Sequence, residues 1–477
     1  MPTTTRPRIW ALIAVSLATF MTYLDNNVIN VAIPTIQRDL HLSESGIEWV
    51  VSGYILVFAA LLLAGGRLAD VIGNRRMFGI GLTIFTAASL FAGISGNMMA
   101  LVASRALQGL GAALLTPTAL AIISATYPDP DERTRAVGIW SAVGALALAT
   151  GPLVGGILSQ DASWHWIFFL NIPVGLATLA LGAWAIPVTD RRPARLDLPG
   201  VLTSTLALGG ITFALIEGPQ LGWTNVATIA GFLVAVVSAT AFLRVEQQAA
   251  DPMVDLRIFS NRIFAGGVTA MMLWAFGLFG IYFYTSLYLQ DILHFGAIEA
   301  GAAFVPMALL MATGAAVSDR VAARFGAQRS VGWAMGLMGA GIASVSLLGA
   351  HAPFISLMPG LAVIGIGGGL TIPLTATILG VMPADRAGVA SGIFNATREL
   401  AGLLGVTIIG VILTARMHAR VHAGATAQSA FLSGYRMSLI IAGAMVAAGG
   451  VAAWRSLGTA RRTAPVGAGE PVLELAV

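Results

Sequence analysis

The sequence contains no cysteine and no lysine, and only 10% of its 477 residues are charged. Without cysteine, the chain has no disulfide bond, no thiolate nucleophile and no Cys-ligated metal. Without lysine, it lacks a P-loop lysine and a Schiff-base lysine, which excludes a transporter that carries its own ATPase on the same chain. Soluble proteins have about 25% charged residues, so most of this chain's surface is not expected to face water.

Long apolar stretches fill the chain, since 57% of the residues are hydrophobic and 56 residues are glycine. A helix that crosses a bilayer needs about 20 mainly apolar residues. The sequence contains fourteen such stretches, near residues 10–33, 47–66, 77–96, 98–126, 136–158, 165–186, 199–217, 226–243, 263–288, 299–318, 330–349, 354–381, 388–414 and 437–454. The loops between them are too short for a soluble domain. We therefore expect an all-α polytopic membrane protein with fourteen transmembrane helices.

The arginines indicate how these helices are oriented. Arg6 and Arg8 precede the first apolar stretch, and no small-residue cleavage site follows it, which predicts an uncleaved anchor that starts inside. Alternating the loops from there places twenty arginines inside and four outside. The inner set includes Arg75, Arg76, Arg191, Arg192, Arg195, Arg320, Arg324, Arg329, Arg461 and Arg462, and the outer set is Arg38, Arg416, Arg420 and Arg436. This bias predicts that both termini are cytoplasmic.

Two distant segments align without gaps at an offset of 256 residues: GLGAALLTPTALAII from Gly109 and GIGGGLTIPLTATIL from Gly365. The loop at 70–73 also resembles the loop at 319–326, since each has an aspartate before a glycine. Helices rich in glycine and alanine can resemble one another by composition alone. A true repeat instead predicts two parallel six-span halves, an arrangement typical of secondary transporters with a site at the interface.

The repeat divides the chain into three parts. Residues 1–190 are expected to form the first six-helix bundle, and residues 261–477 the second bundle with a cytoplasmic tail. Residues 191–260 are expected to hold two additional central spans and their linkers.

Five short motifs occur on the expected spans in a defined order. They are LDNNVINVAIP from Leu24, GRLADVIGNRR from Gly66, RALQG from Arg105, ALATGPLVGG from Ala147 and WHWIFFLNIP from Trp164. Together they resemble the motifs of the major facilitator superfamily, and within it those of the fourteen-span drug:proton antiporter family. The departures are Val71 and Asn74, where basic residues are usual, Ala147 in place of glycine and His165 in place of arginine.

Asp25 and Arg105 are the candidate pair for proton coupling. Asp25 lies about eight residues from the outer end of span one and Arg105 about seven from the outer end of span four, which places both about 11–12 Å deep at 1.5 Å per residue. A direct or water-bridged contact is therefore geometrically open. A carboxyl whose arginine contact changes between two states can load and release a proton. A static ion pair between two helices is the alternative. The position that matches Arg105 in the second half is Leu361, so this charge belongs to one half only.

Small residues and helix breakers mark the candidate gates. Gly151, Pro152, Gly155 and Gly156 allow a close and bendable contact in span five. The resemblance implies that this contact seals the inner half of the path in the outward state. Ordinary close packing fits the same residues.

The loop after span two holds a second candidate gate, formed by Gly66, Asp70, Gly73 and Arg75. Asp70 is positioned to bond the N-terminus of a facing helix, where backbone N–H groups favour an anion. By resemblance, the partner is the start of span thirteen near Arg386, and the contact would latch the outward-open state.

The expected substrate-binding residues are polar or aromatic side chains within the spans: Asn30, Gln108, Trp274, Tyr282, Tyr284, Asn395 and Arg398. Aromatic side chains bind flat or cationic lipophiles by stacking and cation–π contacts, although lipid-facing aromatics are equally normal. Glu399 stands where the family usually has glutamine, and it is either a second proton site, a counter-charge for cationic substrates or a local partner of Arg398.

These observations predict an exporter in the bacterial inner membrane that moves lipophilic drugs or small metabolites, cationic ones included, in exchange for protons by alternating access. A proton-coupled importer of the same architecture is the alternative, and the span-five signature argues against it. We expect no enzymatic activity, no cofactor and no metal, with His418 and His422 as outer-loop residues. The expected partners are protons, the substrate and lipid, not nucleic acid, and the chain is expected to be a monomer.

Overall fold

The computed structural model describes residues 5–188, 197–249, 252–382 and 387–457, and all regular elements in these ranges are helical. In chain order the elements are α1 (Thr5–Asp39), α2 (Glu44–Ile72), α3 (Asn74–Gly93), α4 (Met98–Thr126), α5 (Pro130–Ile157), η1 (Leu158–Ala162), α6 (His165–Phe169), α7 (Asn171–Ala185), α8 (Leu198–Leu221), α9 (Val226–Gln248), η2 (Leu256–Ser260), α10 (Arg262–Leu287), η3 (Tyr288–Ile292), α11 (Ala297–Phe325), α12 (Ala327–Val345), α13 (Phe354–Gly369), α14 (Ile372–Gly380), α15 (Ala387–His422) and α16 (Ala427–Leu457).

Local sequence signals set many of the helix starts. Capping side chains accept hydrogen bonds from first-turn N–H groups at the start of α2, α4, α5, α9 and α10, namely Ser43, Asn97, Asp129, Asn225 and Asn261. Two helix pairs turn instead on a glycine with positive φ. Gly73 (φ 96°) joins α2 to α3, and Gly326 (φ 84°) joins α11 to α12. Each glycine lies in one of the two loops that resemble each other in sequence.

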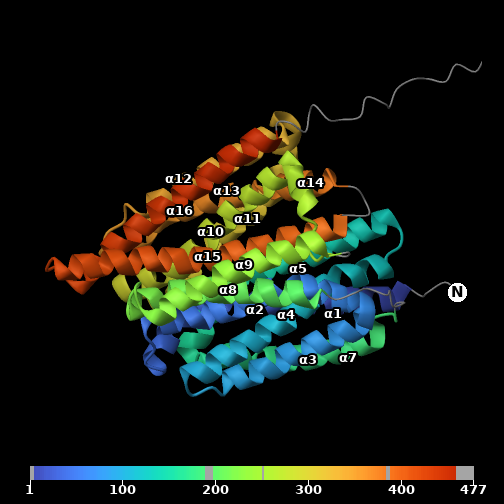
Figure 1. Cartoon of the computed structure of the whole chain (residues 1–477), viewed down its shortest axis with the longest axis horizontal. Helices are drawn as coiled ribbons and strands as arrows, with labels where there is room; N and C mark the ends of the chain where they lie inside the picture. The colour runs from blue at the N-terminus through green and yellow to red at the C-terminus, as the bar shows by residue number, and fades with distance from the viewer. Residues whose placement is uncertain (1–4, 189–196, 250–251, 383–386, 458–477) are drawn as a thin grey trace, which may run out of the picture.

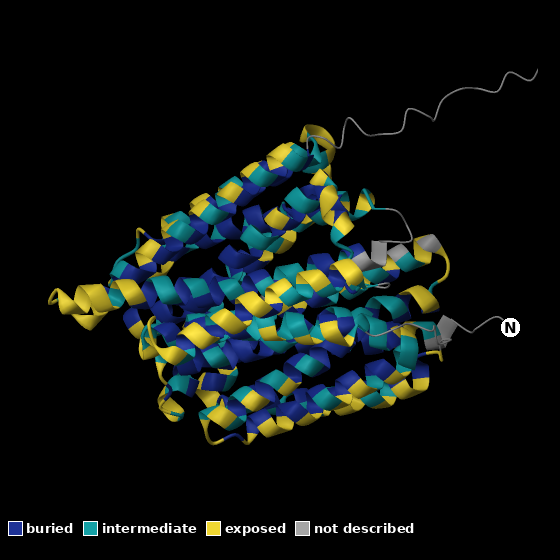
Figure 2. Cartoon of the chain, in the orientation of Figure 1, coloured by how far each residue is buried: buried dark blue, intermediate teal, exposed yellow. Residues whose placement is uncertain are grey.

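The helices form two groups with a pair of helices at their boundary (Figure 1). Helices α1–α7 form one group and α10–α16 the other, and the two groups diverge toward the end where α1 begins and α16 ends. Helices α8 and α9 pack on each other, and α8 contacts both α2 and α15. In the most apolar segment of each helix, 72% of the residues are buried in α2, but only 28% in α8 and 22% in α9. Helices α8 and α9 therefore lie at the surface of the helix bundle (Figure 2).

The same packing scheme occurs in both groups. In the first, α4 packs on α2 and α3, and α1 packs on α5 and α7. In the second, α13 packs on α11 and α12, and α10 packs on α15 and α16. The matched glycines occupy equivalent places. An added Cβ at Gly109 would collide with Tyr54 of α2, and one at Gly365 would collide with Met307 of α11. These contacts support a true structural repeat. The boundaries at 190 and 260 remain a prediction, and the first lies outside the described residues.

The structure does not reach the expected number of spans by length and apolarity. Among the described residues, twelve helices meet both criteria, and a thirteenth is the pair Asp131–Leu148 and Thr150–Ala162, bent by 40°. The expected span that does not meet the criteria, residues 330–349, corresponds to α12. It is a helix of 19 residues that has Gln328 and Arg329 in its first turn and is rich in glycine, which lowers its apolarity.

Candidate substrate and proton site

A central pocket of about 830 Å³ of empty space, part of it open to the surroundings, lies between the two halves. Its lining residues come from α1, α2, α5, α10, α11 and α15: Tyr23, Asn26, Asn27, Asn30, Val51, Ile55, Leu148, Trp274, Leu278, Phe279, Tyr282, Met311, Arg398, Glu399 and Val406. The wall is mainly apolar, with a few amides and one acid–base pair.

Aromatic side chains of α10 form one wall of this pocket. Tyr282 stacks on Phe304 of α11, with ring centroids 4.9 Å apart, which holds its ring in place. Among the described residues, Trp274 Nε1 is buried without a hydrogen-bond partner. An indole N–H of this kind is a donor available to a ligand.

Arg398 and Glu399 form the charged part of the wall. The Arg398 Nη2 and Nε atoms lie 2.6 and 3.1 Å from Glu399 Oε1, so the two adjacent residues neutralise each other. Glu399 is only 3% exposed. The local pairing considered from the sequence is therefore present, yet both side chains also line the pocket.

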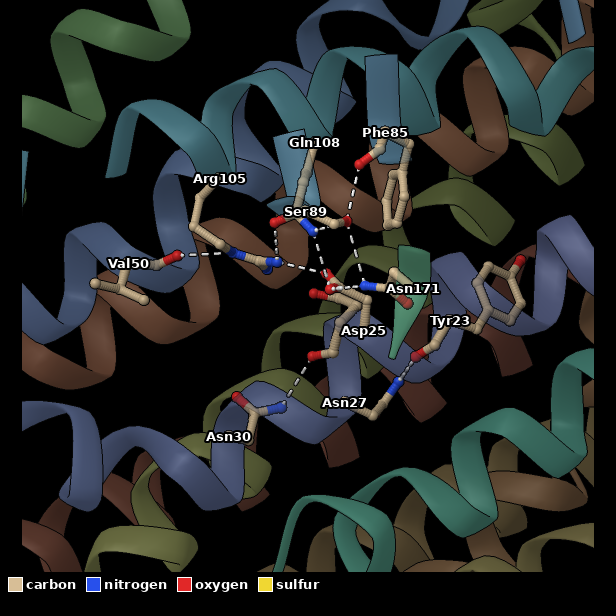
Figure 3. Close-up of polar contacts among 11 residues, drawn as sticks. Tyr23, Asp25, Asn27, Asn30, Val50, Phe85, Ser89, Arg105, Gln108 and Asn171 are labelled. Atoms are coloured by element: carbon tan, nitrogen blue, oxygen red, sulfur yellow. Dashed lines mark hydrogen bonds and ion pairs between the residues drawn. The ribbon is translucent and has the colours of Figure 1, made fainter. Parts of the chain in front are cut away.

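Asp25 and Arg105 form a direct ion pair with fully buried side chains (Figure 3). Asp25 Oδ1 accepts two further hydrogen bonds, from Gln108 Nε2 at 3.0 Å and from Asn171 Nδ2 at 2.8 Å. Arg105 also donates from Nη1 to Gln108 Oε1 at 2.9 Å and from Nε to the Val50 carbonyl at 3.2 Å. With Ser89 of α3, which bonds both Gln108 and Asn171, the network joins α1, α2, α3, α4 and α7. Of the direct and water-bridged contacts that the matching depths left open, the structure has the direct one, whereas its role in proton coupling stays a prediction.

This network lies inside the first half and not on the wall of the central pocket. Asp25 is not among the pocket's lining residues, although its neighbours Asn26 and Asn27 are. The Arg105 guanidinium lies 4.5 Å from the centroid of the Tyr54 ring, and its Nη2 atom is buried without a hydrogen-bond partner among the described residues. Any proton exchange at Asp25 therefore requires these helices to move.

Four of the seven expected substrate-binding residues line the central pocket: Asn30, Trp274, Tyr282 and Arg398. The other three have partners elsewhere. Gln108 bonds Asp25 and Ser89 inside the first half. Tyr284 bonds Glu48 of α2, and Asn395 Nδ2 bonds the Ser391 carbonyl of its own helix. The physical reason for Gln108 and Tyr284 is helix rotation, because they stand on faces of α4 and α10 that turn toward neighbouring helices, whereas Asn395 bonds back to its own helix.

The span-five residues make close contacts at one end of α5. An added Cβ at Gly151 would lie 2.7 Å from Asn27 Cβ, and one at Gly155 would lie 2.6 Å from the Val28 carbonyl oxygen. An added Cβ at Gly156 would collide with the Ala297 carbonyl of α11. Pro152 supplies the carbonyl that Gly301 of α11 approaches. In the orientation expected from the arginines, this end is the outer one. In this structure the contact between α5 and α11 therefore lies at the end that this orientation places outside, and the inner seal that the resemblance implies for the outward state stays a prediction.

The loop after α2 is described, whereas the expected partner of its Asp70 is not. Asp70 is exposed at the end of α2, and its expected partner near Arg386 lies outside the described residues. Arg75 donates a hydrogen bond to the Ala183 carbonyl of α7. An added Cβ at Gly66 would meet only Pro117, at 3.7 Å. The latch therefore remains a prediction.

Sequence reasoning missed three polar residues that the structure brings to functional positions. Ser89 and Asn171 complete the Asp25 network, and Asn171 stood within a quoted motif that hinted at a role. Glu48 is buried between the two halves. Glu48 is the second residue of the expected span 47–66, and an acidic residue at that place indicates the end of a span rather than a functional site.

Comparison with known proteins decides the family. Residues 15–406 match the Major Facilitator Superfamily. The chain belongs to this superfamily. It is 33% identical over 416 residues to multidrug resistance protein Stp of Mycobacterium tuberculosis, covering 87% of this chain and 77% of that protein. It is 35% identical over 425 residues to the tetracenomycin C resistance and export protein of Streptomyces glaucescens, covering 86% and 77%.

Solved structures agree on the fold. A bacterial homolog of the human lysosomal transporter Spinster, in an inward-facing and unoccupied conformation, has a TM-score of 0.65 at 16% identity and covers 96% of this chain and 99% of its own. A peptide transporter POT in complex with sulfate has a TM-score of 0.66 at 17% identity and covers 95% and 94%. Family and fold point to a multi-pass membrane transporter rather than an enzyme.

Proposed function

We propose that this superfamily member exports small lipophilic compounds, cationic ones included, across the bacterial inner membrane in exchange for protons. The central pocket between the two halves is the observation that carries the proposal. Its wall combines stacked aromatic side chains, a free indole donor and one acid–base pair. A pocket of this kind fits flat, apolar molecules. The relatives named for multidrug resistance and for tetracenomycin C resistance and export support the direction of transport that we propose.

We also propose that the chain has fourteen spans, with α12 as the one that falls short in apolarity. Helix α12 packs against α11, α13 and α16 as a full member of the second half. It occupies the place that α3 has in the first half, and α3 does qualify as a span. An even number of spans agrees with α1 beginning and α16 ending at the same end of the bundle. The arginine distribution favours a cytoplasmic location for that end.

Transport would proceed by alternating access between the two halves. The contacts of α5 with α11 and of α2 with α15 near the outer ends would close the outside while substrate enters from the inside. Breaking them and closing the inner ends would then release substrate outside. One proton that moves down a potential of about 100 mV releases about 2.3 kcal/mol, which sustains a concentration ratio of nearly fifty-fold.

The test is transport by the purified protein in sealed vesicles with an imposed pH gradient, with a fluorescent lipophilic cation as probe. The proposal predicts that the probe moves against its own gradient and opposite to the proton flow, and that a protonophore abolishes this movement. Movement of probe and protons in the same direction would indicate an importer. Absence of proton-dependent movement for cationic and neutral lipophiles alike would refute the proposal.

A further inference from the structure

Glu48 is an acidic side chain buried at the outer contact between the two halves. It lies one turn into α2 and is 7% exposed. Its Oε1 atom lies 3.0 Å from the hydroxyl of Tyr284 in α10. The same hydroxyl lies 3.0 Å from the Val406 carbonyl of α15. Glu48 thus joins a helix of the first half to two helices of the second.

The hydrogen count at Tyr284 distinguishes the two forms of Glu48. A tyrosine hydroxyl has one hydrogen, and it faces two oxygens. If Glu48 is ionised, both neighbours only accept, and one of the two contacts lacks a hydrogen. If Glu48 carries a proton, its O–H donates to Tyr284 Oη, and Tyr284 donates to the Val406 carbonyl. The neutral form therefore satisfies both contacts.

The charges around Glu48 also favour the neutral form. Glu44 of the same helix and Glu217 of α8 are the charged groups that face it. Glu217 accepts a hydrogen bond from Trp49 Nε1 at 2.8 Å. Asp291 lies across a pocket that Glu44 and Glu48 also line, and it is itself faced by Arg38 and His294. Among the described residues that line this pocket, none is basic. An ionised Glu48 would be a buried charge without a cationic partner, which is costly.

A glycine makes room for this contact. An added Cβ at Gly410 of α15 would collide with both Glu48 Oε1 and Tyr284 Oη. The Glu48 carboxyl and the Tyr284 hydroxyl therefore contact the backbone of α15 at position 410, where only glycine fits. The pocket lined by Glu48 lies at the outer ends of α1, α2, α10, α15 and α16, which gives water a route to the carboxyl.

We propose that Glu48 is a proton-binding site that couples closure of the outer side to the pH outside. When the halves close on the outer side, Glu48 takes up one proton from the outer water and donates it in a hydrogen bond to Tyr284. When they open, the carboxyl returns to water and releases the proton there. Acid outside therefore favours the closed state, which would draw the exporter back to its inward-facing form after it releases substrate. The inference rests on the alternating access of the proposed function, and it is separate from Asp25 and Glu399.

The test measures the distance across the outer side as a function of pH. Because the chain has no cysteine, Met99→Cys and Leu347→Cys supply the only attachment sites for spin labels. Met99 and Leu347 are 78% and 81% exposed, at the outer ends of the first and second halves. Pulsed electron resonance of the full chain in lipid nanodiscs, between about pH 5 and pH 9, reports the ratio of closed to open molecules. One linked proton changes that ratio by up to about tenfold per pH unit.

The expected result is a closed fraction that rises on acidification in the parent and stays high at all pH values in Glu48→Gln, whose amide can donate to Tyr284. Tyr284→Phe removes the acceptor for the Glu48 proton, so its transition should move to lower pH. Glu44→Gln removes a negative charge that favours the neutral form of Glu48 and leaves the contact with Tyr284 intact, so its closed fraction should still rise on acidification with the parent's steepness, at somewhat lower pH.

A parent without pH dependence, or a Glu48→Gln variant with the parent's full dependence, would overturn the inference. If Glu48→Gln is not monodisperse after purification, the direction of the shift in Tyr284→Phe decides, because a shift to higher pH or no shift contradicts the proposed bond. The distances are measured without substrate. A failure of vesicle transport with an intact pH-dependent distance would therefore count against the exporter function and not against the proton site.

Discussion

Asp25 of α1 and Arg105 of α4 form an ion pair that is completely buried within the first half, and neither side chain lines the central pocket. The position matching Arg105 in the second half is occupied by the buried Leu361. The two halves thus share a backbone scheme but differ in charge. This asymmetry gives each half a separate role: the first holds a closed polar network, and the second supplies the aromatic and charged wall of the pocket.

Replacing Arg105 by leucine, the residue of the matching position, leaves Asp25 buried without its cation. Removing one partner of a buried pair costs about 3–5 kcal/mol, and protonation of Asp25 relieves part of that cost. We expect the variant to lose thermal stability at neutral pH and to regain part of it as the pH falls.

Thermal unfolding of Arg105→Leu in detergent across pH checks this. The double variant Arg105→Leu/Asp25→Asn removes both charges and should recover stability at neutral pH. A double variant that is as unstable as the single one would show that the loss comes from packing against Tyr54 rather than from the unpaired charge.

Glu399→Gln tests the role of the charged part of the pocket wall. The variant removes the carboxylate that neutralises Arg398 at 2.6 Å, so a free positive charge remains beside the substrate. Resistance to cationic compounds should fall about tenfold more than resistance to neutral ones, since one unbalanced charge at short range amounts to at least about 1.4 kcal/mol. Growth assays in an efflux-deficient host with matched cationic and neutral lipophiles measure this. Equal loss for both classes would assign Glu399 to coupling or folding.

Trp274 tests whether the aromatic wall binds substrate. Trp274→Ala removes a large ring and the free indole donor, and we expect affinity for a fluorescent lipophilic cation to fall about tenfold, in keeping with a stacking and cation–π contact of about 1–2 kcal/mol. Trp184→Ala is the control, because the Trp184 side chain of α7 is 66% exposed and does not line the pocket. Similar affinities for the two variants would exclude this wall as the binding surface.

Gly156→Ala tests the outer contact between α5 and α11. The added methyl group would collide with the Ala297 backbone, and overpacking of this kind costs about 1–3 kcal/mol. We expect the outer side to stay open and the transport rate to fall about tenfold or more. Gly138→Ala on the same helix meets no atom within 4 Å and should transport normally. A transport rate for Gly156→Ala equal to that of Gly138→Ala would mean that this contact does not have to close.

Depth in the membrane could be predicted from the sequence, whereas side-chain direction could not. The Asp25–Arg105 contact was predictable because a helix rises by a constant amount per residue, so the distance to the span end fixes the depth. Gln108 and Tyr284 were wrongly assigned to the substrate site, because the depth of a residue along a helix does not determine which neighbouring helix its side chain faces. Glu48 was overlooked because its partner belongs to the other half of the molecule, and no local pattern announces such a contact.

The span count shows the same limit. Apolarity identifies α8 and α9, which are rich in apolar side chains, more readily than α12, which has Gln328 and Arg329 in its first turn and carries glycines for close contact with its neighbours. The repeat was predictable from matched glycines such as Gly109 and Gly365, because a close backbone approach leaves a signature in the sequence.

Proton-driven uptake of a lipophilic cation into inverted membrane vesicles, compared between the parent and Asp25→Asn, tests the central claim most directly. Asparagine keeps the shape of the side chain and its contacts with Gln108 and Asn171, but it cannot release a proton. The account predicts that uphill uptake and substrate-induced proton release collapse in Asp25→Asn, while downhill exchange of substrate for substrate survives. Full uphill uptake by Asp25→Asn across the pH range would contradict it and would assign the coupling proton to another residue.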